Sequence, residues 1–190
     1  MNALPFTAQL INVFAAVLLL LSFAMLAQRR ILSLVDLLAW QGAALVGSTL
    51  AVAYSTGQQH LYYSAALTLA LKVILVPLVL HRLIRRLAVR WYTEPLLNIP
   101  ATMIVGLALV VFSFGLAQPI SALASTVTRS TLGIAIAVVM LSFLMMITRR
   151  KAISQVIGFL AMENGLFFAA TSATYGMPMV VELGVALDVL

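Results

Sequence analysis

The feature that most constrains this chain is a series of apolar runs, each about twenty residues long, that recur along its whole length. A helix of that length crosses the ~30 Å hydrocarbon core of a bilayer, and it satisfies its own backbone hydrogen bonds, which lipid cannot do. Only 8% of the residues are charged, against roughly 25% in soluble domains. The sequence therefore predicts an all-α, polytopic transmembrane helical bundle.

The apolar runs predict about seven membrane spans. No positive charge precedes the first run and Arg29-Arg30 follow it, which is the reverse of a cleavable signal peptide. The last run covers only about 18 Å, too little to cross a bilayer, so we expect the native chain to continue past Leu190. The expected spans are 6–28, 31–54, 61–81, 101–118, 131–147, 152–174 and 179 to the end.

The basic residues predict the orientation. Seven spans place Arg29-Arg30, the arginines of 82–90 and Arg149-Arg150-Lys151 on one side, and Arg129 on the other. By the positive-inside rule these three groups are cytoplasmic and the N-terminus is outside, so topology accounts for the net charge of +6 without nucleic-acid binding. Residues 82–91 have the pattern of an amphipathic stretch that lies along the headgroups, or that docks a cytoplasmic partner.

Three ionisable side chains are expected in the middle of spans, namely Lys72, Glu163 and Asp188. A charge at that depth costs at least ~3 kcal/mol, so such residues are seldom passive and are candidates for an ion pathway. A purely structural ion pair is the alternative for Lys72. Pro77 lies five residues after Lys72, where its missing N–H predicts a break in the helix that frees the carbonyl of Val73.

The remaining polar residues of the spans are more ambiguous. Glu182 closely follows Pro178, so it belongs either to the same pathway or to the outer interface. Gln41 is expected at mid-helix, where it predicts a hydrogen bond between helices, and it is counted among the candidate residues of the ion pathway. Asp36 is expected to be the interfacial counter-charge of Arg29-Arg30.

A faint internal repeat organises the chain. A first three-helix unit, 1–92, and a second, 131–190, share a basic cluster, a polar residue at mid-helix and an ionisable residue in the following span. Residues 93–130 then form a linker helix and an external loop. The two units would be parallel repeats, with Gln41 in the place of Glu163 and Lys72 in the place of Asp188.

No redox centre is predicted in this chain. Cysteine is absent, which excludes thiolate-bound clusters. His60 and His81 fall at opposite ends of one predicted helix, about 31 Å apart at 1.5 Å per residue, so the two cannot ligate one haem. We therefore expect no cofactor and no catalytic centre in this subunit.

The motifs around these residues resemble the hydrogenase-4 component E family, a membrane subunit of hydrogenases related to respiratory complex I. The resemblance rests on Lys72-Val73-Ile74-Leu75-Val76-Pro77-Leu78, on Met162-Glu163-Asn164-Gly165, and on Val181-Glu182-Leu183-Gly184 with Asp188. Residues 149–190 are also similar to the K-type subunit of complex I and the C subunit of multi-subunit cation/proton antiporters. The K-type acid would fall at Leu160, so Glu163 lies one turn further on.

The resemblance implies a non-catalytic subunit of a redox-driven complex in a prokaryotic plasma (inner) membrane. Its buried ionisable residues would carry protons or Na⁺, and the redox centres would belong to partner subunits. The implied partners are antiporter-like membrane subunits and a cytoplasmic hydrogenase arm. A passive scaffold for a cytoplasmic enzyme arm and a cation/proton antiporter subunit are the alternatives.

The orientation gives a direct test. Because the chain has no native cysteine, single cysteines placed at positions 3 and 85 can be labelled with a membrane-impermeant maleimide. We expect labelling at position 3 in intact cells, and at position 85 only after the membrane is opened. Strong labelling at 85 and none at 3 in intact cells would contradict the predicted orientation.

Overall fold

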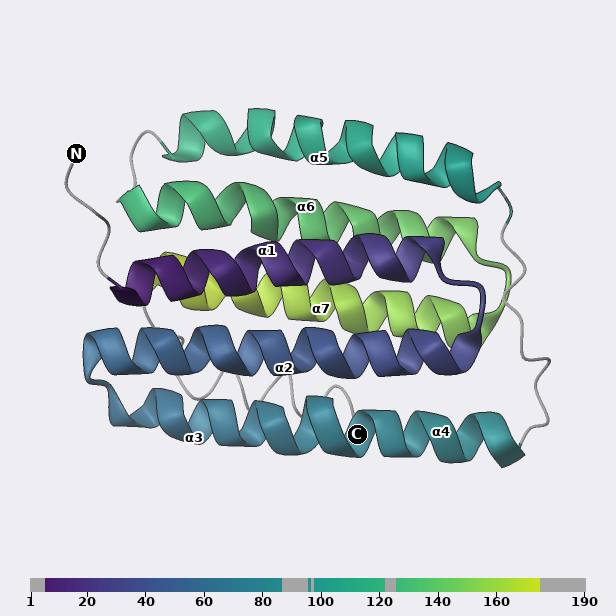
Figure 1. Cartoon of the computed structure of the whole chain (residues 1–190), viewed down its shortest axis with the longest axis horizontal. Helices are drawn as coiled ribbons and strands as arrows, with labels where there is room; N and C mark the ends of the chain where they lie inside the picture. Colours follow the sequence, from purple (N-terminus) through teal and green to yellow (C-terminus); the bar gives the residue numbers. More distant parts are fainter. Residues whose placement is uncertain (1–5, 87–95, 97, 122–125, 175–190) are drawn as a thin grey trace.

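The structure, a computed structural model, describes residues 6–86, 96, 98–121 and 126–174 (Figure 1). Within these ranges the chain forms helices joined by short turns, and six helical segments are long and apolar enough to cross a membrane. The predicted all-α membrane architecture is confirmed. The run that begins at 179 lies outside the described residues. The segments are α1 (Phe6–Ala27), α2 (Ile31–Thr56), a composite third segment, α5 (Ile99–Ser121), α6 (Thr126–Thr148) and α7 (Ala152–Thr174).

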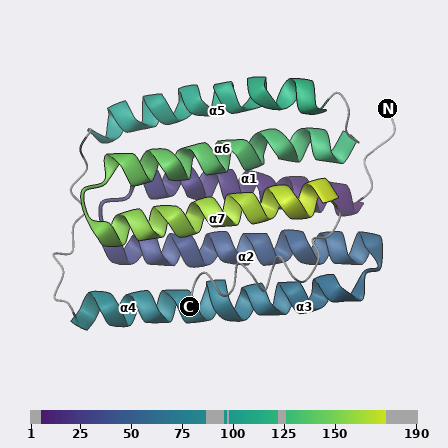
Figure 2. The same ribbon diagram turned by 180° about the vertical axis from the view of Figure 1, so that it is seen from behind.

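Four helices form the centre of the bundle. In Figure 1, α1 lies in front of α7, with α6 on one side of this pair and α2 on the other, and Figure 2 shows the same arrangement from behind. Helix α1 packs against both α2 and α6, and α7 packs against the same two helices. Helix α5 covers the outer side of α6, and the composite segment covers the outer side of α2.

The four central helices run in two opposite directions. Helices α1 and α6 run in one direction, while α2 and α7 run in the other (Figure 1). Helix α5 falls in the stretch predicted as a linker. The division into two three-helix units stays a prediction, because residues 175–190, which would complete the second unit, lie outside the described residues.

The composite third segment departs from the expected boundaries. It consists of α3 (Gln59–Thr68), a π-helical stretch η1 (Leu69–Leu75) and α4 (Val76–Arg86). An amphipathic stretch was expected to begin at residue 82, apart from the span. The structure instead continues α4 without interruption to Arg86, because Leu80 and Ile84 pack into the core while the arginines stay exposed. Residues 87–91 lie outside the described residues.

One end of the bundle collects positive charge, and we call it the basic end. Helices α1, α4 and α6 finish there, and α2, α5 and α7 begin there (Figure 1). Six exposed arginines lie at or near these helix ends: Arg29, Arg30, Arg82, Arg85, Arg86 and Arg150.

Arg149, between α6 and α7, is buried, with only 2% of its surface exposed. Its Nη2 donates to the carbonyl oxygens of Leu26 and Gln28, each at 2.8 Å, and to that of Met25 at 3.4 Å. These are carbonyls at the end of α1, where the helix lacks internal donors and a cation is favoured by the helix dipole. Burial, and then the charge of Arg29, lower the pKa of Arg149, but a guanidinium in a protein stays charged.

Replacing Arg149 tests whether its hydrogen bonds to the carbonyl oxygens at the end of α1 stabilise the protein. We expect Arg149→Met to destabilise the protein by about 2–4 kcal/mol, because several charge-assisted hydrogen bonds are lost and buried carbonyls are left unpaired. The matched control is Arg150→Met, an exposed neighbour whose loss should change stability by no more than about 0.5 kcal/mol. Thermal unfolding of the purified variants in detergent measures both. Equal loss in the two variants would contradict the assignment.

Candidate functional site

A polar layer crosses the bundle at mid-depth, between two apolar clusters. The cluster toward the basic end includes Met25, Leu34 and Leu141. The cluster toward the opposite end includes Leu18, Leu45 and Phe168. Between them, α1, α2, η1 and α7 each contribute polar side chains to one connected group, which we call the polar layer: Ser22, Gln41, Lys72, Glu163 and Asn164.

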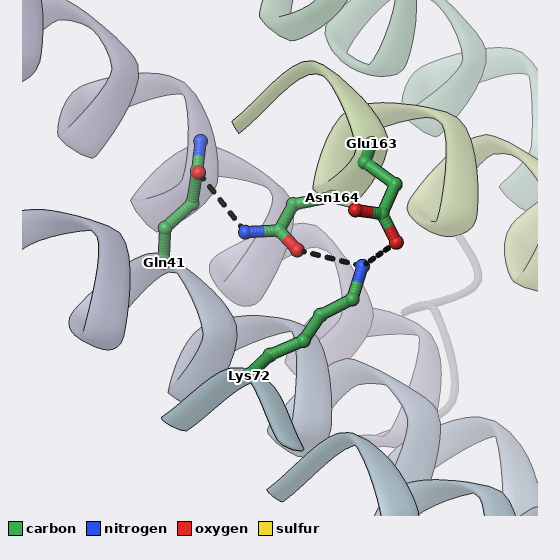
Figure 3. Close-up of polar contacts among 4 residues, drawn as sticks. All are labelled: Gln41, Lys72, Glu163 and Asn164. Carbon is green, nitrogen blue, oxygen red and sulfur yellow. Dashed lines mark hydrogen bonds and ion pairs between the residues drawn. The ribbon is translucent and has the colours of Figure 1, made fainter. Parts of the chain in front are cut away.

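The Lys72 ammonium is at the centre of the polar layer. Its Nζ lies 2.8 Å from Oε1 of Glu163 and donates to Oδ1 of Asn164 at 3.1 Å (Figure 3). The same nitrogen lies 5.5 Å from the centroid of the Phe167 ring, within the range of a cation–π interaction. The Lys72 and Glu163 side chains are only 12% and 13% exposed. The cation is thus held by a carboxylate, an amide oxygen and an aromatic face.

Asn164 links this ion pair to the other side of the bundle. Its Nδ2 donates to Oε1 of Gln41 at 3.2 Å, and Nε2 of Gln41 donates to Oγ of Ser22 at 2.9 Å (Figure 3). The Ser22 hydroxyl in turn donates to the carbonyl of Leu18 at 2.9 Å. The predicted hydrogen bond from Gln41 to another helix is present. A continuous series of hydrogen bonds therefore joins α7 to α1 through α2.

The π-helical stretch brings Lys72 to the polar layer. The N–H of Val76 bonds to the carbonyl of Leu71, which is the wider i to i−5 turn of a π-helix. Pro77 follows directly. A break in the helix was predicted at this point; the segment instead widens into a π-helix and continues as α4. The two ends of the segment are each roughly 20 Å from Lys72, at 1.5 Å per residue.

Gly42 lets η1 approach α2. A Cβ atom at this glycine would lie 3.3 Å from Cγ2 of Val73 and 3.5 Å from Cβ of Lys72. Gly42 is adjacent to Gln41, so the absence of a side chain brings the backbone of Lys72 close to the helix that carries the amide.

Glu163 has hydrogen-bonding capacity to spare. Its Oε1 faces the ammonium, whereas its Oε2 is buried and has no hydrogen-bond partner in the part of the chain that the structure describes. A narrow cavity of about 10 Å³ adjoins the Glu163 side chain. This volume is close to the ~10–15 Å³ that one water molecule needs. Its lining is Leu38, Lys72, Val76, Leu160, Glu163 and Asn164. Leu160 and Glu163 thus share one face of α7, as the one-turn offset predicts.

The structure brings together three of the predicted site residues, namely Gln41, Lys72 and Glu163, with Pro77 beside them. Glu182 and Asp188 lie outside the described residues. Ser22 and the bridging role of Asn164 were not predicted. Asn164 stands beside Glu163 in the Met162-Glu163-Asn164-Gly165 motif, so the motif held the signal, whereas nothing in the sequence singles out Ser22 among the hydroxyl residues of the spans.

The fold and the polar layer define a class, a polytopic helical membrane protein with a buried lysine–glutamate pair at mid-depth. The uncharacterized protein Rv0085 of Mycobacterium tuberculosis (strain ATCC 25618 / H37Rv) is 34% identical over 182 residues, which cover 95% of this chain and 83% of that protein. The chain belongs to the same family as this mycobacterial protein.

A more distant relative has a descriptive name. Hydrogenase-4 component E of Escherichia coli (strain K12) is 28% identical over 134 residues, and the Shigella flexneri protein of that name matches to the same extent. The match covers 70% of this chain and 61% of the relative. No family model matches the chain. No solved structure matches it either.

A substitution at Gly42 tests the geometry of the site. We expect Gly42→Val to destabilise the protein by about 1–3 kcal/mol, because the added methyl groups push η1 away from α2. The control is Gly115→Val in α5, where a Cβ meets nothing within 4 Å. Thermal unfolding in detergent compares the two. Equal stability of the two variants would show that the close approach is not required.

Proposed function

We propose that this chain is a membrane subunit of a hydrogenase-type complex, and that its Lys72–Glu163 pair belongs to an ion pathway through the membrane. The similarity to Hydrogenase-4 component E supports the first part. The buried ion pair at mid-depth supports the second and is the observation on which the proposal depends. We take the ion to be a proton, because an ammonium and a carboxylate in contact can exchange one directly.

Stability alone is a weak reason for carrying such a pair. Transfer of two charges from water into a low-dielectric interior costs several kcal/mol per ion, and their attraction often fails to repay it. A purely structural ion pair would also be expected to use both carboxylate oxygens of the glutamate in hydrogen bonds. Here Oε2 of Glu163 has no donor among the described residues, and a small cavity adjoins the Glu163 side chain. That free oxygen is the natural place for an arriving proton to bind.

The mechanism we propose is electrostatic. A proton that binds the Glu163 carboxylate neutralises the counter-charge of the Lys72 ammonium, 2.8 Å away. Among the described residues, the ammonium then keeps the Asn164 amide oxygen and the Phe167 ring but has no counter-charge, so it releases its own proton more readily. Deprotonation of Glu163 reverses the change. Gln41 and Asn164 act as positioning residues, because a neutral amide holds the lysine without exchanging its proton.

The energy for directed movement would come from electron transfer in partner subunits, which we propose hold the redox centres. The partners would be other membrane subunits, including antiporter-like ones, and a cytoplasmic hydrogenase arm on the basic end. This places the basic end in the cytoplasm and the protein in a bacterial inner membrane. Glu182 and Asp188 remain candidates for further steps of the same pathway.

The test uses Lys72→Met, Glu163→Gln and the double variant in the intact complex. We expect all three to assemble and all three to lose proton uptake in sealed vesicles by at least about tenfold. A control is Thr49→Val, which removes a buried hydroxyl that bonds only to Leu45 of its own helix and should leave uptake unchanged.

A purely structural ion pair predicts the opposite pattern of assembly and proton uptake. Breaking a buried pair leaves an uncompensated charge and costs about 3–5 kcal/mol, whereas replacing both partners is often harmless. If the single variants fail to assemble while the double variant assembles and pumps normally, the pathway proposal is wrong and the subunit is a scaffold.

A further inference from the structure

A second pair of ionisable side chains lies between the polar layer and the basic end. Oδ1 of Asp36 on α2 lies 3.8 Å from Nε2 of His81 on α4. Asp36 was expected to pair with Arg29-Arg30; the structure instead places it within ion-pair distance of His81, because the start of α2 packs against α4. Each residue is about 8 Å from the nearer end of its helix, at 1.5 Å per residue.

The hydrogen bond on the other side of the ring fixes what this pair can do. Nδ1 of His81 lies 3.0 Å from the carbonyl oxygen of Pro77, which can only accept, so Nδ1 carries a hydrogen and donates it. Nε2 is then the ring atom that is free to bind and release a further proton, and it is the atom that faces the carboxylate. The pair therefore has one defined place for a mobile proton, the Nε2 atom that faces Asp36.

Both side chains are partly exposed at the surface of the bundle. The His81 side chain is 30% exposed and that of Asp36 is 63% exposed. The charged groups on the packed elements are Arg82, Arg85 and Arg86 on α4, Arg30 at the start of α2, Lys72 in η1 and Glu163 on α7. Asp36 is thus a lone carboxylate among cations at this end, within the described part of the chain. It attracts protons to a surface that otherwise repels them.

The pair lies on the same two helical segments as Gln41 and Lys72 of the polar layer. His81 follows Lys72 by about 13 Å along the segment, at 1.5 Å per residue. The cavity beside Glu163 is lined on this side by Leu38 and Val76, which come from the same two helices as Asp36 and His81. Glu163 also lines that cavity.

We infer that Asp36 and His81 form the proton-exchange site of the basic end, which takes protons from water and passes them toward Glu163. A proton from bulk water binds Nε2 of His81 and gives an imidazolium paired with the Asp36 carboxylate. The imidazolium returns to neutral imidazole as that proton moves, through intervening water, to the Glu163 carboxylate, which becomes a carboxylic acid. Charge and protons balance at each step. The inference rests on the proposed function of Lys72 and Glu163.

The experiment measures the rate of proton uptake by sealed vesicles that carry the intact complex, with the basic end facing the medium. We expect His81→Gln to slow uptake at least about tenfold, because water replaces a positioned acid–base group poorly. Asp36→Asn should slow it less. The matched control is His60→Gln, which changes the other histidine, at the opposite end of the same segment, and should leave the rate unchanged.

Chemical rescue separates proton exchange from a structural role. Imidazole added to the medium should restore much of the uptake rate of His81→Gln, since a small mobile base can replace the missing ring, and it should leave Glu163→Gln inactive. A slow variant that imidazole does not rescue, with unchanged assembly, would overturn the inference.

The outcomes also distinguish this inference from the proposed function. If Lys72→Met and Glu163→Gln lose uptake while His81→Gln keeps the native rate, the pathway stands and protons enter elsewhere. If all of these variants pump at the native rate, both ideas are wrong.

Discussion

The cost of holding charge away from water shapes the centre of this molecule. Lys72 and Glu163 lie where neither side chain reaches an aqueous surface, so each needs partners from within the bundle. Glu163 supplies the counter-charge, Asn164 an amide oxygen and Phe167 an aromatic face. The further bonds through Gln41 and Ser22 give the amide of Asn164 a fixed orientation. Four segments of the chain must therefore meet at one depth for the ion pair to exist.

A second buried cation acts in a different way. Arg149 is held by carbonyl oxygens at the end of α1. It connects the turn between α6 and α7 to the turn between α1 and α2. The two halves of the four-helix centre are thus joined at the basic end by a cation and at mid-depth by the polar layer, with apolar packing between.

Residue types that are rare in membrane spans were the easiest site residues to identify from the sequence. Charged residues are so uncommon in spans that Lys72 and Glu163 were identified from the sequence as site residues, and the lengths of the apolar runs located α1, α2, α5, α6 and α7 within a few residues. Asn164 was harder to identify, because neutral polar residues are common in membrane helices and most of them bond locally.

Contacts between helices distant in sequence were harder still. Asp36 was expected to pair with arginines a few positions away, whereas its neighbour in space is His81 on α4. Arg149 was predicted to be part of a cytoplasmic cluster of three basic residues, and the structure shows that its side chain is buried. In both cases the partner of the side chain depends on which helices pack together. Neither the composition nor the residue spacing of the sequence predicts that packing.

The π-helical stretch has a consequence for how the chain can vary among relatives. The buried positions of α3 end with Ser64, Ala65 and Thr68, and those of α4 begin with Val76 and continue with Leu80 and Ile84. The N–H of Val76 bonds to the carbonyl of Leu71, five residues back instead of four, so the π turn holds one residue more than an α turn. The extra residue is taken up in η1, so the segment behaves as a regular helix with one insertion. A relative without that residue would form a regular α-helix with the same packed faces, and it would lack the wider turn that carries Lys72.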